Sequence, residues 1–355
     1  MLASLLAVAV FAGVGGAGPA PGAGELTLAQ AVGQRIVVSL PGTTVPDALA
    51  RQVRRGEVAG VILFSRNVAS RAQLRVLTAR LQAERRRGPA ALRGLPLLVM
   101  IDQEGGLVKR LPGAPSRSAA GMGATGDPAA VRAEGVATAR NLRDAGVNVD
   151  LAPVLDLGLP GSFQRASGRA FGATPAAVSR YAGAFADGLA AGGVLAAAKH
   201  FPGLGRATTN ADLRINRIEV DRDVLRAQDE APFAAAARDG VPLTMVSTGI
   251  YPALAARPAM FAPAIATREL RDVVGFDGVS ITDDLEVSAL AHLSPERKAL
   301  AAVRAGNDLL LFAQTAAAAR RGAAALRRAI ARGTLARAAI DAGADRVLAL
   351  RERLR

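Results

Sequence analysis

The chain alternates short apolar runs with longer segments whose apolar residues recur at helical spacing. The short runs are rich in β-branched residues and hold few polar positions, which is typical of parallel strands buried on both faces. On this pattern we predict eight strands, at residues 35–40, 60–65, 96–102, 147–157, 194–201, 243–249, 278–284 and 307–312.

Helix start signals separate several of these runs. Asp127, Thr174 and Ser294 each precede a proline, and a capping residue followed by proline suits the first turn of a helix. After Thr174, apolar residues recur at helical spacing as far as Leu189, and glycines 192–193 end the segment. Eight strands, each followed by helical sequence, predict an α/β fold, a (β/α)8 TIM barrel in a single domain. A doubly wound open sheet is the alternative.

The N-terminus has the pattern of an export signal. Residues 2–14, LASLLAVAVFAGV, are apolar but too few to span a bilayer, and the flexible stretch GGAGPAPGAG follows. We therefore predict a signal-peptide-like segment at residues 1–24 and the barrel at 25–355, although the usual positive charge before the apolar run is absent. A disordered apolar tail is the alternative. The chain has no cysteine, which excludes a lipoprotein anchor and disulfides. We expect an exported protein, extracellular, periplasmic or associated with the cell wall, without a membrane span in its mature form.

Composition narrows the partners. The formal charge is +14, but lysine occurs only three times and the arginines are spread along predicted polar helix faces. A solvated surface explains this better than a nucleic-acid site, and an anionic cell wall is a more suitable partner. Only 3% of the residues are aromatic, whereas glycine and alanine abound, so we expect the helices to pack through small residues.

Ionisable residues stand at the ends of several predicted strands. In a (β/α)8 barrel these ends meet at one rim, and charged groups on buried strands are costly unless they are paired or line a cleft. The sequence therefore predicts a functional site at this rim. Caps of the following helices would explain Asp156 or Asp284, but not Lys199. The residues concerned are Asp102, Asp156, Lys199, His200, Asp283 and Asp284.

No feature of the sequence indicates a cofactor. G-x-G-x-x-G patterns occur at residues 13–18 and 121–126, but neither follows a predicted strand, so dinucleotide binding is not expected. His200 and His292 are the only histidines, and no spacing of ligands singles out a metal.

Six ordered segments resemble glycoside hydrolase family 3. KHFPGLG at 199–205 is similar to the family's KHFPGHG, IDQEGGLVKRLPG at 101–113 to its DQEGGRVxRL block, and GVSITDDLEV at 278–287 to its nucleophile segment. GVILFSRN, APVLDLG and SGRAFG resemble three further blocks. The resemblance extends from about Val32 to the C-terminus. It implies a single-domain enzyme like the bacterial β-N-acetylhexosaminidases, which act on N-acetylglucosamine-containing glycans, including peptidoglycan fragments of the cell wall.

The resemblance also implies roles for individual residues. Asp283 matches the nucleophile of a retaining mechanism, and Asp284 is expected to face away from the rim because strand side chains alternate. For Arg110 and Arg169 a structural ion pair is the alternative, and for Lys199 an imine-forming lysine is. Residues that would hold the sugar are Asp102, Arg110, Arg169, Lys199 and His200.

The loop after KHFPGLG departs from the family. The resembling hexosaminidases carry Asp-x-His there, with histidine as the acid/base, whereas this chain has Asn210 and Asp212 at those places. Leu204 replaces the motif histidine, Thr248 stands where relatives often carry one, and His292 lies too far along the chain to substitute.

Three hypotheses follow from this departure. Asp212 is itself the acid/base, which requires its pKa to rise from about 3.9 toward neutrality. Alternatively, a good leaving group or an external nucleophile makes strong protonation unnecessary. In the third, the barrel binds glycans without cleaving them. We predict a retaining glycosidase that removes terminal β-linked N-acetylglucosamine or a related β-glycoside, with a non-catalytic glycan-binding barrel as the alternative.

Overall fold

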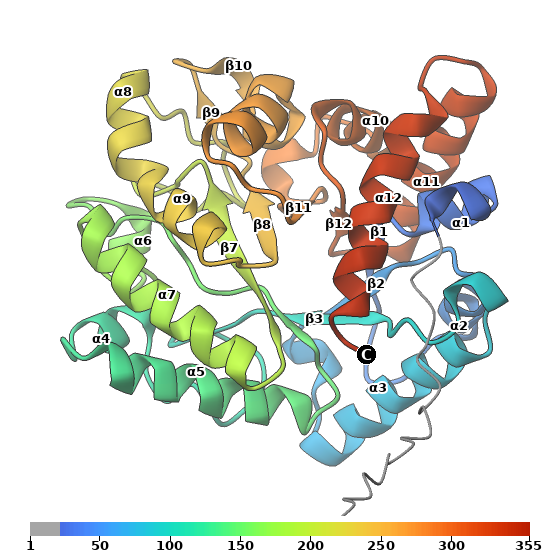
Figure 1. The fold of residues 1–355 in the computed structure, drawn as a ribbon, viewed down its shortest axis with the longest axis horizontal. Helices are drawn as coiled ribbons and strands as arrows, with labels where there is room; N and C mark the ends of the chain where they lie inside the picture. The colour runs from blue at the N-terminus through green and yellow to red at the C-terminus, as the bar shows by residue number, and fades with distance from the viewer. Residues whose placement is uncertain (1–21) are drawn as a thin grey trace, which may run out of the picture.

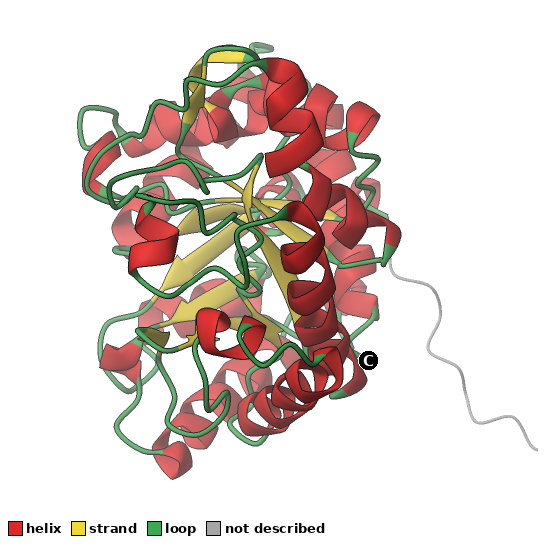
Figure 2. Cartoon of the chain, turned by 90° about the vertical axis from the view of Figure 1, so that its left-hand side faces the viewer, coloured by secondary structure: helices red, strands yellow, loops and turns green. Residues whose placement is uncertain are grey.

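The computed structural model describes residues 22–355, which form a closed barrel of eight parallel strands surrounded by helices (Figures 1 and 2). The strands follow the order β11-β8-β7-β6-β3-β2-β1-β12, and a parallel bridge between Ile281 and Leu309 joins the two ends. The predicted barrel is confirmed and the open-sheet alternative is wrong. Barrel strands are β1 Ile36–Ser39, β2 Gly60–Leu63, β3 Leu98–Ile101, β6 Val149–Asp150, β7 Leu195–Phe201, β8 Leu243–Val246, β11 Val279–Thr282 and β12 Leu310–Phe312.

Each predicted strand contains one observed strand, but the strand observed within residues 147–157 is much shorter than predicted. Only β6 pairs regularly there, and the chain beyond it keeps a single bridge from Val154 to Lys199. Pro153 has no N–H to donate, so the ladder cannot continue through it. Four further short strands form hairpins outside the barrel: β4 Gln103–Gly105 with β5 Val108–Lys109, and β9 Ile250–Tyr251 with β10 Ala255–Pro258.

Helices cover the outside of the barrel. The three predicted caps are present: the Asp127, Thr174 and Ser294 side chains each accept a backbone N–H from the first turn, at 2.8, 3.3 and 3.4 Å. The helices are α1 Leu28–Gly33, α2 Asp47–Arg55, α3 Arg71–Arg86, α4 Ala119–Gly123, α5 Pro128–Arg143, α6 Phe163–Ala166, α7 Pro175–Ala191, α8 Arg222–Val224, α9 Ala231–Arg238, α10 Pro295–Ala305, α11 Ala316–Ala331 and α12 Arg337–Glu352, with π-helical η4 Leu225–Asp229 and η6 Ala264–Val273. Short 3₁₀ turns are η1 Ala23–Glu25, η2 Ser65–Asn67, η3 Ala90–Leu92, η5 Ala259–Phe261 and η7 Ser288–Leu290.

Helices α5 and α7 pack through glycine, as the composition predicts. A Cβ on Gly135 would lie 2.4 Å from the carbonyl oxygen of Phe185, and one on Gly188 would lie 2.3 Å from that of Arg132. Any larger side chain would therefore push the two helices apart. None of the helices in residues 22–355 is long and apolar enough to cross a membrane.

Most of the predicted signal-like segment, residues 1–24, lies outside the described residues. Of its last residues, Ala23 is fully buried, and its N–H donates to Oδ1 of Asp345 on α12 at 2.6 Å. The chain therefore joins the packed body of the barrel at Ala23, slightly before the predicted start at residue 25.

Along the strands, the inward-facing apolar residues of the core are followed by inward-facing residues of the site. Val37, Ile62 and Ile281 are among the residues that fill the barrel interior, which Val347 and Leu350 of α12 close at the N-terminal end. Outward-facing residues instead pack beneath the helices. Because side chains alternate, the positions two residues beyond the last inward apolar residues also face inward. At the C-terminal rim these positions are Asp102 after β3, Lys199 in β7 and Asp283 after β11.

Candidate active site

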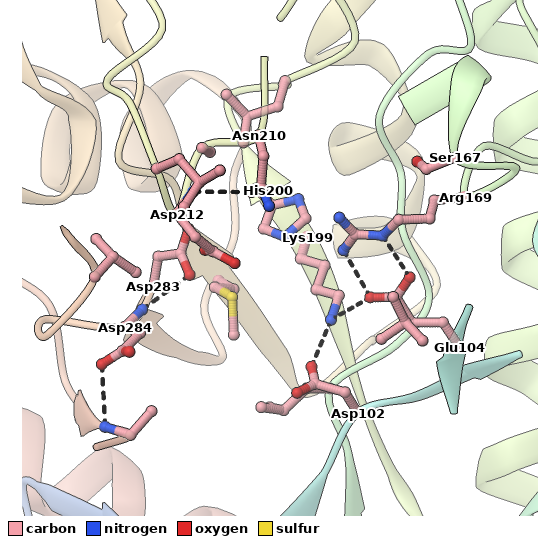
Figure 3. A pocket seen from close by; sticks show the side chains of 18 of the residues that line it. Asp102, Glu104, Ser167, Arg169, Lys199, His200, Asn210, Asp212, Asp283 and Asp284 are labelled. Atoms are coloured by element: carbon pink, nitrogen blue, oxygen red, sulfur yellow. Dashed lines mark hydrogen bonds and ion pairs between the residues drawn. The ribbon is translucent and has the colours of Figure 1, made fainter. Parts of the chain in front are cut away.

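A cavity of about 590 Å³ opens at the C-terminal ends of the strands (Figure 3). This is the end of a (β/α)8 barrel at which catalytic residues gather. All seven residues predicted for the site line the cavity. They are Asp102, Arg110, Arg169, Lys199, His200, Asp212 and Asp283.

One wall of the cavity is a buried ion cluster centred on Lys199. Its Nζ lies 2.8 Å from Oδ1 of Asp102 and 2.6 Å from Oε1 of Glu104. Arg169 approaches the same Glu104 with two nitrogens, both at 2.8 Å (Figure 3). Sequence reasoning missed Glu104. A signal was available, since Glu104 stands two residues after Asp102 and therefore on the same face of an extended chain.

The cluster favours the charged forms of Lys199 and Glu104. Burial opposes the charge of Lys199, but Asp102 and Glu104 outweigh it and raise the pKa of the ammonium group. Burial likewise opposes the charge of Glu104, and Lys199 and Arg169 nevertheless hold the pKa of this carboxyl well below its usual range. An imine-forming lysine must be neutral to attack, so this environment argues against that alternative for Lys199.

The two arginines differ in their contacts. Arg169 forms an ion pair with Glu104, as its alternative interpretation predicted, but this pair is part of the cavity wall. Arg110 is held more loosely, with Nη2 at 3.7 Å from Oδ2 of Asp102 and its guanidinium 5.7 Å from the ring centre of Phe64. Its donors are therefore freer to meet a ligand than those of Arg169.

Asp156 positions His200. Oδ2 of Asp156 lies 2.7 Å from Nδ1 of His200, and Oδ1 accepts the backbone N–H groups of His200 and Leu204 at 3.1 and 2.7 Å. A carboxylate surrounded by donors favours the tautomer with its proton on Nδ1, which leaves Nε2 for a ligand. Asp156 is fully buried, and the next helix is capped by Ser162, so a helix cap is the wrong interpretation of Asp156.

Asp283 and Asp284 point in different directions, as alternation predicts, but Asp284 stays at the rim and also lines the cavity. Asp283 is half-buried and faces the cavity, where burial raises the pKa of its carboxyl; His200 opposes this shift and Asp212 adds to it. Asp284 turns toward the end of β12 (Figure 3), where Oδ1 accepts the N–H groups of Glu286 and Ala313 at 2.9 and 3.0 Å. Asp284 therefore ties two rim loops together beside Asp283.

The loop with the Asn-x-Asp departure is docked onto η7, the turn that follows β11 and Asp283. The backbone carbonyl of Asp212 accepts the Ser288 hydroxyl at 2.7 Å and the Ala289 N–H at 3.1 Å. Asn210 shapes this turn, because its Oδ1 accepts the N–H of Asp212 at 3.0 Å. The structure thus brings the Asp212 and Asp283 carboxylates to one side of the cavity (Figure 3).

Leu204, Thr248 and His292 do not supply a proton donor to the cavity. Leu204 lines the cavity but is apolar and buried. Thr248 is fully buried and His292 is exposed, and neither side chain lines the cavity. Within residues 22–355, no group of three or more histidine, aspartate or glutamate side chains is arranged to hold a metal ion.

A buried carboxyl beneath the ion cluster makes stability depend on pH. Burial raises the pKa of Asp150 to about 8, against the lowering effects of the Gln103 N–H and Lys199. In the unfolded chain the pKa of this carboxyl is about 3.9. Between about pH 4 and about pH 8 the folded state therefore binds more protons than the unfolded state, and the free energy of unfolding falls as the pH rises. Asp150→Asn should flatten this decline, measured by denaturant unfolding across that range. The exposed Asp277→Asn is the control, and an unchanged pH dependence in Asp150→Asn would contradict the assignment.

A barrel whose rim cavity holds the Asp212 and Asp283 carboxylates beside a buried ion cluster defines a site suited to glycosidic bond chemistry. The chain belongs to glycosyl hydrolase family 3, since residues 27–350 match the model of the Glycosyl hydrolase family 3 N terminal domain. The sequence-based assignment to this family is confirmed.

Relatives and solved structures agree with this membership. An uncharacterized secreted glycosyl hydrolase of Arthroderma benhamiae is 36% identical over 93% of this chain and 94% of its own. The structure of a β-N-acetylglucosaminidase from a Paenibacillus species superposes with a TM-score of 0.87 at 32% identity, covering 93% of this chain but 63% of that one. A β-N-acetylhexosaminidase from Beutenbergia cavernae superposes with a TM-score of 0.84 at 32% identity, over 92% of this chain and 99% of its own.

Proposed function

We propose that this chain hydrolyses terminal β-linked N-acetylglucosamine from glycans, including peptidoglycan fragments, and retains the configuration at the anomeric carbon. The observation that carries the proposal is the pair of carboxylates from different loops, Asp283 and Asp212, on one side of a cavity whose opposite wall is a fixed ion cluster (Figure 3). The names of the relatives, β-N-acetylglucosaminidase and β-N-acetylhexosaminidase, support the choice of sugar.

In the proposed mechanism Asp283 attacks the anomeric carbon while the bond to the leaving-group oxygen breaks. Asp212 gives a proton to that oxygen. Water then gives a proton back to Asp212, attacks the anomeric carbon and releases Asp283. Asp102, Arg110, Arg169, Lys199 and His200 would hold the hydroxyls and carbonyl of the sugar, because charged donors and acceptors in fixed places strengthen oriented hydrogen bonds.

We further propose that the protein is exported, with a signal-like segment within residues 1–24 that ends before Ala23, and that it works at the cell wall. The secreted relative from Arthroderma benhamiae supports export. The net charge of +14 suits an anionic wall.

The direct test is turnover of 4-nitrophenyl N-acetyl-β-glucosaminide, with the matching β-glucoside as the comparison for sugar choice. We expect hydrolysis of the N-acetylglucosaminide to dominate, and proton NMR to show the β-anomer as the first product. Sugar binding without turnover of any aryl β-glycoside would overturn the proposal and leave the non-catalytic glycan-binding barrel.

A further inference from the structure

Gln164 lies in the wall of the cavity, and the proposed function gives it no role. It belongs to α6, in the loop after β6, and its side chain is 3% exposed and lines the cavity. Two backbone contacts fix its position. The N–H of Phe163 donates to the carbonyl of Ala207 at 2.8 Å, and the carbonyl of Gln164 accepts the N–H of Arg169 at 2.9 Å. Gln164 is therefore held between the ion cluster and the loop that follows β7.

The side chain of Gln164 completes the hydrogen bonding of Asp156. Nε2 of Gln164 donates to Oδ2 of Asp156 at 2.7 Å, and Nδ1 of His200 lies 2.7 Å from the same oxygen. The other oxygen, Oδ1, accepts the backbone N–H groups of His200 and Leu204. A carboxylate offers about four lone-pair positions, so these four donors occupy it fully. Asp156 is therefore fixed in one orientation, and so is the imidazole that it holds.

The amide of Gln164 keeps this orientation against an opposing cost. Within residues 22–355, its buried Oε1 has no hydrogen-bond partner. A buried acceptor without a partner is unfavourable, and a leucine or methionine side chain of similar size would serve packing equally well. Turning the amide over would place Oε1 against Oδ2 of Asp156, with two acceptors in contact. The donor contact with Asp156 is therefore the interaction that decides how Gln164 is oriented.

We propose that Gln164 is a positioning residue that, through Asp156, keeps a proton of His200 on Nδ1 and presents Nε2 as the acceptor for one hydroxyl of the sugar. The inference rests on the proposed function, which places the sugar against His200. Without the Gln164 donor, Oδ2 would have His200 as its only partner, and the carboxylate could turn into the space left by the amide. The imidazole would lose its fixed direction, and the less occupied carboxylate would favour the doubly protonated ring, which has no acceptor to offer.

Binding of N-acetylglucosamine and its 3-, 4- and 6-deoxy analogues to the full chain tests this role, because calorimetry needs no turnover. In the wild type, the analogue that lacks the hydroxyl bound by His200 should bind about 5-fold more weakly than the parent sugar, the scale of one hydrogen bond. In Gln164→Leu the parent sugar should lose about the same factor, and its advantage over that analogue should shrink to within about 2-fold. Gln82→Leu is the matched control, since this amide bonds the backbone of Leu97 outside the cavity, and it should keep the wild-type affinity.

Gln164→Glu keeps the size of the side chain and makes its donor depend on pH. A protonated carboxyl donates to Asp156 as the amide does, whereas an ionised one repels it, and two carboxyl groups in contact share one proton. The ratio of variant to wild-type affinity should therefore fall by about 5-fold or more between about pH 5 and about pH 8. Besides the histidine, the groups that interact with the charge of Asp156 include Arg169, Asp229 and Tyr251, which both proteins carry and which therefore cancel in the ratio.

Three results would overturn the proposal: wild-type affinity for N-acetylglucosamine in Gln164→Leu, a ratio for Gln164→Glu that does not change with pH, or a loss in Gln164→Leu that all four sugars share equally. The last result would leave the penalty of the deoxy analogue in place and show that Gln164 only supports the fold of its loop. Failure of the proposed function is distinguishable from these results, because the wild type itself would then bind none of the four sugars, and this inference would fall with it.

Discussion

Asp283→Asn is expected to lower kcat/KM for aryl N-acetyl-β-glucosaminides by at least about 1,000-fold, the scale on which removal of a nucleophile acts. The amide keeps the size of the side chain and its place after β11 but cannot form the glycosyl-enzyme bond. Asp283→Ala with added azide should yield the α-glycosyl azide, because azide attacks from the side that the carboxylate occupied. The rate is measured by release of the phenol and the product configuration by NMR.

The exposed Asp272→Asn serves as the control, because it removes a carboxylate of the same type from the end of η6, outside the cavity. It should keep the wild-type rate. If Asp283→Asn retained more than a tenth of the activity while remaining folded by circular dichroism, Asp283 would not be the nucleophile.

Asp212→Ala is expected to affect substrates according to their leaving groups. With an alkyl aglycone, whose oxygen needs a proton, kcat/KM should fall by about 100-fold or more, whereas with 2,4-dinitrophenol it should fall by less than about 10-fold. Azide should then accelerate turnover of the dinitrophenyl substrate and give the β-glycosyl azide, because azide needs no general base to attack the glycosyl-enzyme. Steady-state rates and product NMR measure both effects.

Glu219→Gln is the matched control, since Glu219 is an exposed carboxylate further along the same connection and outside the cavity. Losses of equal size on both leaving groups in Asp212→Ala would remove Asp212 from the acid/base role. The Asn210→Asp/Asp212→His variant adds a positive test, because it restores the Asp-x-His dyad of the resembling family. It should increase hydrolysis of the alkyl glycoside if the loop supplies the proton.

Most of the barrel could be predicted from local patterns. Buried parallel strands read as continuous apolar runs, and the caps at Asp127, Thr174 and Ser294 need only neighbouring residues to form, so both signals are present in the sequence. The extent of β6 could not be predicted in this way. Its pairing depends on strands β3 and β7, and the apolar run continues well beyond the residues that pair regularly.

The candidate site, too, could be predicted only in part from local patterns. Alternation from the inward apolar residues places Asp102, Lys199 and Asp283 at the rim, and it separates Asp283 from Asp284. Lys199 contacts Glu104, which lies 95 positions earlier in the chain (199 − 104). His200 contacts Asp156, which lies 44 positions earlier (200 − 156). No local pattern specifies such contacts.

The sequence by itself therefore determined the fold class, the family and the rim on which the ionisable residues gather, because periodicity and motif spacing are local properties. Only the tertiary structure decided which of those residues meet. It gathered Asp102 and Glu104 around Lys199 in a buried ion cluster, placed Asp156 against His200, and docked Asp212 beside Asp283. Each of these outcomes depends on closing the barrel, which brings the loops of distant strands around a single cavity.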